Sequence, residues 1–156
     1  MKKIALSLLT VVLAAVLIFG LCSCNQPEAP AVPEGSSQGS AINRVGLWAD
    51  ADYVEDTTFG SGAKTVLVEV KVGEESVTFT IKTDKTMLGE ALIEHNLIAG
   101  EEGPYGLYIK KVNGITADFD IDQSYWGFYK NGEYMMSGVD TTEIADGEHY
   151  ELVYTK

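Results

Sequence analysis

The chain has 156 residues, with 11 basic and 23 acidic side chains, a formal net charge of −12 and only two cysteines. This length suits one folded domain and leaves little room for a second. A surface this acidic repels nucleic acid and anionic lipid, so neither is expected as a partner.

The N-terminal segment has the three parts of a secretory signal. Lys2 and Lys3 precede an apolar run from Ile4 to Leu21, and Cys22-Ser23-Cys24 follows that run. The alternative is a transmembrane helix, but a span takes ~20 apolar residues and no basic stop-transfer cluster follows the run. Residues 1–23 are therefore predicted to be a signal peptide.

The four residues Leu21-Cys22-Ser23-Cys24 resemble the lipobox of bacterial lipoproteins. The resemblance implies cleavage before Cys24 and acylation of that cysteine, and a diacyl anchor holds a protein stably to a membrane. We therefore expect an extracytoplasmic protein, lipid-anchored to the cell membrane at Cys24. Cleavage would also remove Lys2 and Lys3, leaving nine basic against 23 acidic residues, or −14, and no cysteine free for a disulfide.

Two segments separate this anchor from the regular part of the chain. Residues 24–41 are rich in Pro, Gly, Ser, Ala and Gln, a composition that predicts a flexible tether. Residues 42–64 contain Trp48, Tyr53 and Phe59, which suggests a lead-in that docks on the domain or adds an edge strand. The folded domain is predicted over 65–156.

The domain begins with a predicted β-hairpin. In Thr65–Val72, valines alternate with Leu67, Glu69 and Lys71, and Val77, Phe79 and Ile81 alternate with polar residues after a Gly-Glu-Glu turn. Period-2 alternation predicts half-buried strands.

A short amphipathic helix should follow. Leu88, Ala91, Leu92 and His95 have helical spacing, with Asp84 or Thr86 as the N-cap. His95 could serve a metal or acid–base chemistry, but a lone histidine at a helix end more often has a structural role.

After a predicted loop at 99–105, further strands are expected at 107–112, 125–130, 133–136 and 150–155. The first two end at Asn113-Gly114 and Asn131-Gly132, pairs that strongly favour tight hairpins. The element order predicts an α+β domain of β-grasp type: a mixed sheet of about five strands packed on one helix, in the order strand-strand-helix-strand-strand-strand.

The sequence does not favour an enzyme. It has no free thiol, no Gly-x-Ser-x-Gly elbow and no phosphate-binding glycine loop, and its two histidines lie on different elements. One metal alternative exists, a calcium site at Asp118, Asp120 and Asp122. Gln123 and Tyr129 stand where an EF-hand loop needs glycine and a bidentate glutamate, so an acidic loop or edge strand with Phe119 and Ile121 facing inward is the competing interpretation.

Aromatic residues gather in the predicted hairpin at 125–136. Trp126 and Phe128 should face one side of their strand and Tyr125 and Tyr129 the other. Only one set can enter the core. The other is covered by the lead-in, exposed, or used for binding.

Four segments around this hairpin, 106–114, 124–128, 135–139 and 146–153, resemble the transcobalamin-like C-terminal domain. This domain is similar to the β-domain of transcobalamin and intrinsic factor, and it also occurs alone in bacterial surface lipoproteins of unknown function. The resemblance covers about 65–156. It implies a cobalamin or corrinoid ligand, with contacts at Tyr108, Trp126, Phe128, Met135 and Met136.

This chain lacks the large helical domain that completes the carriers' pocket, and its loop at 114–124 is longer and more acidic. The first functional hypothesis is therefore a non-catalytic lipoprotein that binds a corrinoid or a similar small ligand, alone or with a partner protein that completes the site. The alternative is a surface module that uses the same fold to bind a protein or a glycan without cobalamin. No cofactor is otherwise implied.

Overall fold

The computed structural model describes residues 41–104 and 106–156, which all lie in one compact unit. The predicted signal peptide, Cys24 and nearly all of the predicted tether lie outside the described residues. Within the described ranges, no helix has the length and apolar character of a membrane span.

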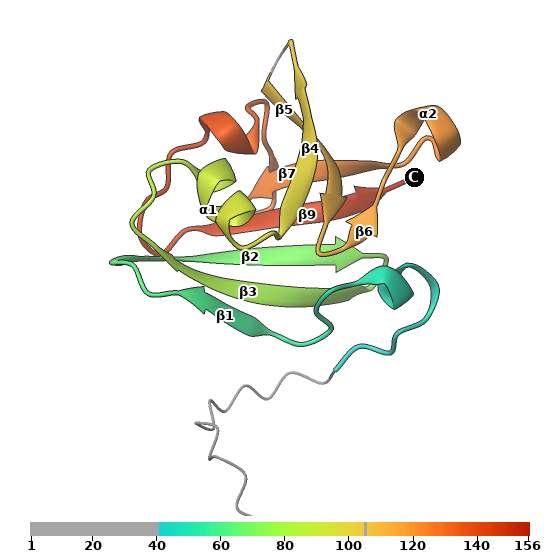
Figure 1. The fold of residues 1–156 in the computed structure, drawn as a ribbon, viewed down its shortest axis with the longest axis horizontal. Coiled ribbons are helices and arrows are strands. Elements are labelled where there is room, and N and C mark those ends of the chain that lie inside the picture. Colours follow the sequence, from blue (N-terminus) through green and yellow to red (C-terminus); the bar gives the residue numbers. More distant parts are fainter. Residues whose placement is uncertain (1–40, 105) are drawn as a thin grey trace, which may run out of the picture. The chain divides into compact units, whose positions relative to one another are not determined.

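The domain contains nine strands, two short α-helices and two 3₁₀ helices (Figure 1). In chain order these are η1 (Gly46–Asp50), β1 (Thr57–Gly60), β2 (Lys64–Val72), β3 (Glu75–Thr83), α1 (Leu88–Glu94), β4 (Ile98–Gly103), β5 (Gly106–Val112), β6 (Ile115–Thr116), α2 (Phe119–Asp122), β7 (Tyr125–Lys130), β8 (Glu133–Tyr134), η2 (Val139–Thr141) and β9 (His149–Thr155).

Six strands form one mixed sheet in the order β1-β3-β2-β9-β7-β8. β1 runs parallel to β3 and β2 runs parallel to β9, whereas the other pairs are antiparallel. β4, β5 and β6 form a second, antiparallel sheet, whose β4–β5 hairpin rises from the larger sheet in Figure 1. The predicted α+β class and mixed sheet are confirmed, but the single sheet of about five strands was an underestimate.

The core lies between the six-stranded sheet and a layer made of α1 and the smaller sheet. The alternating residues of β2 and β3 point into it, and Val68, Phe79 and Ile81 are fully buried. From the opposite side α1 contributes Leu88, Ala91 and Leu92, also fully buried. The period-2 and helical patterns therefore identified the inward faces correctly.

The predicted helix cap is wrong. The N-cap position is Met87, whose side chain makes no capping bond, and the Asp84 carboxylate instead accepts a hydrogen bond from the Ala63 backbone N–H at 2.9 Å. Asp84 thus braces the β1–β2 turn, a role that depends on a contact 21 positions away in the sequence.

The predicted loop at 99–105 is also wrong over most of its length, because β4 occupies Ile98–Gly103. Only Ile98 of this strand is fully buried, so β4 carries no apolar alternation. Its Gly100 lies against β5, where a Cβ atom would stand 2.1 Å from the Tyr108 carbonyl oxygen. β8 is shorter than predicted, since it ends at Tyr134.

Residues 118–122 form neither a loop nor an edge strand. Asp118 is the N-cap of α2, accepting a hydrogen bond from the Asp120 N–H at 3.0 Å. Phe119 and Ile121 are 54% and 83% exposed, so the expectation that they face inward is wrong. A single helical turn held by its cap does not need a buried apolar face.

Residues 41–56 are joined to the domain by Asn113, at the turn between β5 and β6. This fully buried side chain accepts from the Tyr53 N–H at 2.9 Å and donates to the Tyr53 carbonyl at 2.8 Å. Asn113 also has a positive φ of 49°, as the Asn-Gly turn requires. Trp48 is buried close by in the core, and β1 then forms the edge strand of the large sheet (Figure 1).

We expect Asn113→Ala to lower the free energy of unfolding by about 3 kcal/mol, because it removes two buried hydrogen bonds and strains a left-handed residue. Asn131→Ala is the matched control. Its φ of 51° is the same strain, but its side chain makes no hydrogen bond within the described residues, so about 1 kcal/mol is expected. Urea unfolding measures both. Hydrogen exchange should speed up at residues 42–54 in the Asn113 variant alone, and equal losses in the two variants would contradict this role.

Candidate functional site

Strand β7 supplies the aromatic floor of the candidate site. It pairs with β9 so that Trp126 is opposite Tyr154 and Phe128 opposite Leu152. Trp126 and Phe128 are each 7% exposed and belong to the core. The Trp126 ring meets Tyr154 edge-on, with 5.5 Å between centroids. Of the two aromatic sets on this strand, the Trp126 set therefore faces inward.

The second set, Tyr125 and Tyr129, lies on the outer face of the sheet. Tyr125 is 37% exposed, and Tyr129 packs edge-on against Tyr134 of β8 with 5.3 Å between centroids. The lead-in does not cover this hairpin, since β1 lies at the opposite edge of the sheet. Tyr53 and Phe59 pack instead on Phe79, with centroids 5.8 and 5.7 Å from its ring.

The rim of the site comes from β5 and from the chain that follows β8. Tyr108 on β5 is 43% exposed and Met136 is 94% exposed. Met135 is half-buried, and its N–H donates to the Phe128 carbonyl at 2.9 Å. This bond extends the pairing with β7 beyond the end of β8 and keeps Met135 and Met136 next to that strand.

These residues enclose a cleft of about 300 Å³, called here the aromatic cleft. Its lining residues are Leu107, Tyr108, Ile109, Tyr125, Trp126, Phe128, Tyr134, Met135, Met136, Ser137, Gly138 and Val139. All five side chains expected to contact a ligand, from three separate parts of the chain, line this one cleft. A smaller apolar pocket of about 240 Å³ adjoins it, since Leu107 and Tyr108 line both.

No charged side chain lines the aromatic cleft. Its polar character comes from Ser137, the tyrosines and the Trp126 indole, whose Nε1 is buried and has no hydrogen-bond partner within the described residues. Such an arrangement suits a largely apolar ligand with few polar contacts. Sequence reasoning missed Leu107, Ile109 and Ser137–Val139, because no pattern placed β5 beside η2.

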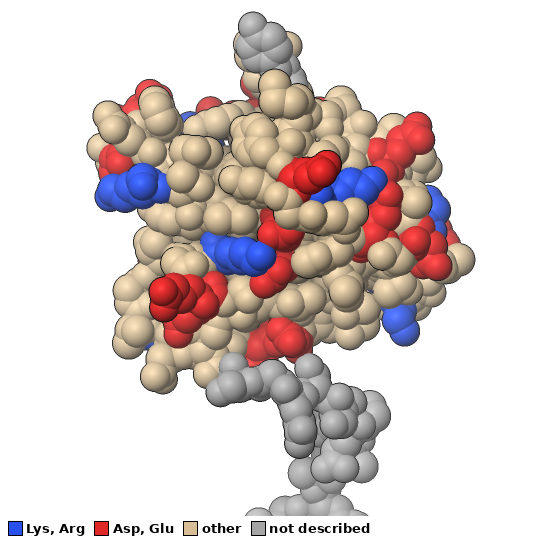
Figure 2. Space-filling model, turned by 180° about the vertical axis from the view of Figure 1, so that it is seen from behind, with Lys and Arg blue, Asp and Glu red and all other residues tan. Residues whose placement is uncertain are grey.

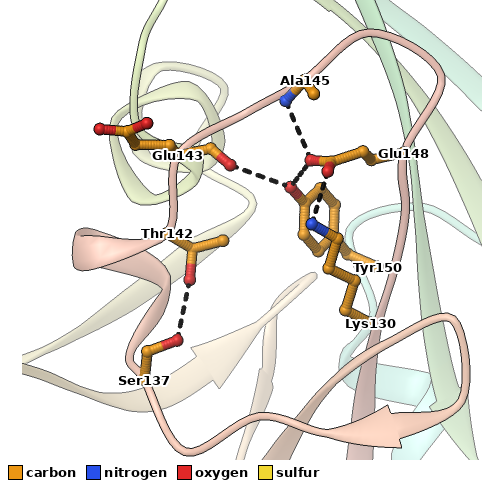
Figure 3. Close-up of polar contacts among 7 residues, drawn as sticks. All are labelled: Lys130, Ser137, Thr142, Glu143, Ala145, Glu148 and Tyr150. Carbon is orange, nitrogen blue, oxygen red and sulfur yellow. Dashed lines mark hydrogen bonds and ion pairs between the residues drawn. The ribbon is translucent and has the colours of Figure 1, made fainter.

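A partly buried polar network (Figure 3) includes Tyr150, which contacts the cleft residue Phe128. Glu148 accepts hydrogen bonds from the Lys130 ammonium at 2.5 Å, the Ala145 N–H at 2.9 Å and the Tyr150 hydroxyl. The Tyr150 ring stacks on Phe128 with 5.9 Å between centroids. Glu148 therefore fixes the tyrosine against which one wall residue of the cleft packs.

Burial is the largest single influence on Glu148 and opposes its ionisation. The hydrogen bonds from Lys130, Tyr150 and Ala145 together outweigh burial and lower the Glu148 pKa from 4.5. Burial and the neighbouring carboxylate raise the pKa of Tyr150, which keeps its hydroxyl protonated as the donor. The network is thus a partly buried carboxylate with three hydrogen-bond donors, which offset the cost of its burial.

Asp118, Asp122 and His95, which belong to the two metal candidates, make other contacts. Asp118 caps α2, and Asp122 accepts from Ser124 N–H at 3.1 Å and from Lys156 at 2.8 Å. The Lys156 and Ser124 hydrogen bonds lower the pKa of Asp122 to about 2. Within residues 41–104 and 106–156, no three His, Cys, Asp or Glu side chains are placed to hold a metal ion. His95 stacks on Phe59, with 5.2 Å between ring centroids.

Residues 84–156 match the family model described as a domain of unknown function, DUF4430. A crystal structure of a "putative metal binding protein" from Ruminococcus gnavus is 38% identical and covers 60% of this chain and 97% of that chain, with a TM-score of 0.57. This chain belongs to the same family as that protein.

Haptocorrin in complex with cobinamide gives a weaker match. It is 23% identical, the TM-score is 0.46, and the match covers 63% of this chain and 26% of the haptocorrin chain. A likeness at that level does not assign a ligand. No curated protein matches the chain.

We expect Glu148→Gln to lower the free energy of unfolding by about 2 kcal/mol at pH 7, because it leaves the partly buried Lys130 without a counter-charge. The folded-state pKa of Glu148 lies below its unfolded value of 4.5. The stabilisation is therefore present at neutral pH and is lost as pH falls below 4.5 through the folded pKa. The difference between variant and wild type should shrink over that window.

Denaturant unfolding at pH 7, 5 and 3 measures this effect. Glu101→Gln is the matched control, since Glu101 pairs with Lys110 at 3.1 Å but its side chain is 71% exposed. An exposed pair contributes less than about 1 kcal/mol. A Glu148 deficit that is independent of pH would contradict the assignment.

Proposed function

We propose that this protein is a non-catalytic ligand-binding lipoprotein, and that the aromatic cleft is its binding site for a corrinoid or a similar flat small molecule. The observation that carries the proposal is the convergence of Tyr108, Trp126, Phe128, Met135 and Met136 on one cleft. The resemblance to a cobalamin-binding domain implies ligand contacts at these positions, which lie up to 28 residues apart in the sequence.

The chemistry of the cleft supports this proposal. Trp126 and Phe128 give a rigid aromatic floor, while Met135 and the exposed Met136 give a flexible wall that adapts to an irregular apolar edge. The cleft has a volume of about 300 Å³, so a corrinoid would lie across it and not within it. One face of such a ligand stays in water, which limits affinity. We therefore propose that a partner protein completes the site when tight binding is needed.

The arrangement of the central strands supports a β-grasp assignment. β3, β2, β9 and β7 are neighbours in that order, and α1 follows the β2–β3 hairpin. In this arrangement β9, the last strand of the domain, lies within the sheet between β2 and β7.

The second candidate function is recognition of a protein or a glycan by the outer face of the same hairpin. Tyr134 is 58% exposed and Tyr125 is 37% exposed, with Tyr129 between them. Tyrosines offer flat amphipathic contact area to macromolecular partners. Tyr125 and Tyr134 also line the cleft, whereas Tyr129 does not, so a variant of Tyr129 separates the two functions.

To test the cleft, cobinamide should be titrated by calorimetry into the full chain in non-ionic detergent. Tyr108→Ser and Met136→Ser remove exposed apolar surface and leave the core intact. Each should weaken binding about fivefold, from roughly 1 kcal/mol of lost contact.

Ile121→Ser is the matched control for this titration, because Ile121 is 83% exposed and does not line the cleft. Binding that these substitutions do not affect, or no binding at millimolar cobinamide, would exclude a cleft that acts alone. Loss of partner binding on Tyr129→Ser, a residue outside the cleft, with cobinamide binding absent, would favour the alternative.

Membrane anchoring is proposed from the lipobox at residues 21–24. Cys24→Ser should abolish incorporation of labelled fatty acid and move the protein from the membrane to the soluble fraction of the envelope, because two acyl chains are needed for stable attachment. Cys22→Ser is the control, since the proposed cleavage removes Cys22. Labelling that persists without Cys24 would contradict the anchor.

A further inference from the structure

A second cavity, of about 350 Å³, lies apart from the aromatic cleft and shares no lining residue with it. Three segments form it: the β1–β2 turn, the end of β3 with the loop after it, and the C-terminal end of α1. Its lining residues are Gly60, Ser61, Gly62, Lys82, Thr83, Asp84, Lys85, Glu94 and His95.

The β1–β2 turn, which forms one wall of the cavity, packs directly on the backbone at the end of β3. A Cβ atom at Gly60 would stand 2.1 Å from the Lys82 carbonyl oxygen, and one at Gly62 would stand 2.0 Å from the Thr83 carbonyl carbon. Gly60 also has a positive φ of 71°. Glycine is required at both positions for this close approach. Asp84 then fixes the turn by accepting the Ala63 N–H at 2.9 Å.

The cavity brings two lysines and a histidine together with two carboxylates, Asp84 and Glu94, in an acidic molecule of net charge −12. Lys82 and Lys85 line it, and neither forms an ion pair within the described part of the chain. Lys64 lies alongside, since its ammonium donates to the Lys85 carbonyl at 2.8 Å. Four other lysines, Lys71, Lys110, Lys130 and Lys156, are paired with carboxylates. Figure 2 shows such basic groups beside acidic ones on one face of the molecule.

Two further side chains define the polar character of the cavity. The His95 ring is held by stacking on Phe59, with 5.2 Å between centroids, and its Nε2 lies 3.3 Å from the position that a Cβ at Gly60 would take. Glu94 also lines the cavity and has no basic partner among the residues described. The cavity therefore offers ammonium and imidazole groups to an anion and the Glu94 carboxylate to a hydroxyl donor, while its other carboxylate, Asp84, accepts the Ala63 N–H.

We propose that this cavity binds a phosphate ester that also carries hydroxyl groups. Lys82 and Lys85 neutralise the phosphate, His95 contacts it through Nε2, and Glu94 accepts a hydrogen bond from a hydroxyl. Lysines bind phosphate as point charges. A phosphate carries more negative charge than a carboxylate ligand, so two ammonium groups attract it more strongly. The same chemistry is present in a soluble phosphorylated polyol and in a phosphatidylglycerol headgroup.

The test is an NMR titration of the full chain in non-ionic, phosphate-free detergent, with glycerol 3-phosphate in one arm and short-chain phosphatidylglycerol in the other. Saturable shifts are expected at the backbone amides of residues 60–62 and 82–85. Saturation in the first arm identifies a free phosphate ester, and saturation in the second arm alone identifies the lipid headgroup. Sodium chloride at equal ionic strength corrects for screening.

The double variant Lys82→Gln/Lys85→Gln should raise the dissociation constant about tenfold or more, because it removes both ammonium groups that line the cavity. Lys110→Gln/Lys111→Gln is the matched control, with the same change in charge on β5, outside the cavity. Glu94→Gln should lower the affinity for glycerol 3-phosphate relative to that for inorganic phosphate, because it weakens the hydroxyl contact and removes a charge that repels both anions. The proposal is overturned if neither ligand gives saturable shifts, or if the two double variants lose affinity equally.

Discussion

The structure depends on the parallel pairing of β2 with β9. Six residue pairs, from Leu67 with His149 to Val72 with Tyr154, join the first hairpin of the domain to its last strand. Without this ladder the hairpin β2–β3 and the hairpin β7–β8 would belong to different sheets. The pairing also brings Val70, Leu152 and Phe128 into one row across the sheet. The floor of the aromatic cleft is therefore an extension of the core.

This continuity explains why the cleft residues differ in their roles. Trp126 and Phe128 are needed to pack on β9 whether or not a ligand is present, whereas Tyr108 and Met136 are largely exposed and contribute little to the core. A substitution of the buried pair would change stability and binding together. The exposed pair separates the two effects, because surface substitutions usually change stability by no more than about 0.5 kcal/mol.

Much of the fold was predictable because its strands alternate. Val66, Val68 and Val70 point inward in β2, and Asn-Gly at 113–114 and 131–132 forms tight turns between adjacent strands. The missed elements lack such local signals. β4 has a single fully buried side chain, and α2 is one turn whose apolar residues face solvent. The second sheet could not be anticipated, because its pairing is not encoded in the periodicity of either strand.

The candidate ligand contacts were predicted from the resemblance, but their assembly was not. No spacing rule places Tyr108 and Met135 in one cleft, since they line it together only because β5 packs against β7. The cavity with Lys82 and Lys85 had no sequence signal at all, because its lysines, glycines and histidine come from three elements.

The two sites also differ in kind: the aromatic cleft has no charged lining residue among those described, whereas the second cavity includes unpaired lysines. On so acidic a molecule, an anion would be repelled from most of the surface and would gain attraction mainly where ammonium groups lack carboxylate partners. A ligand for the cleft must therefore be held by contact and not by charge, so the part of the ligand that the cleft leaves in water limits the affinity.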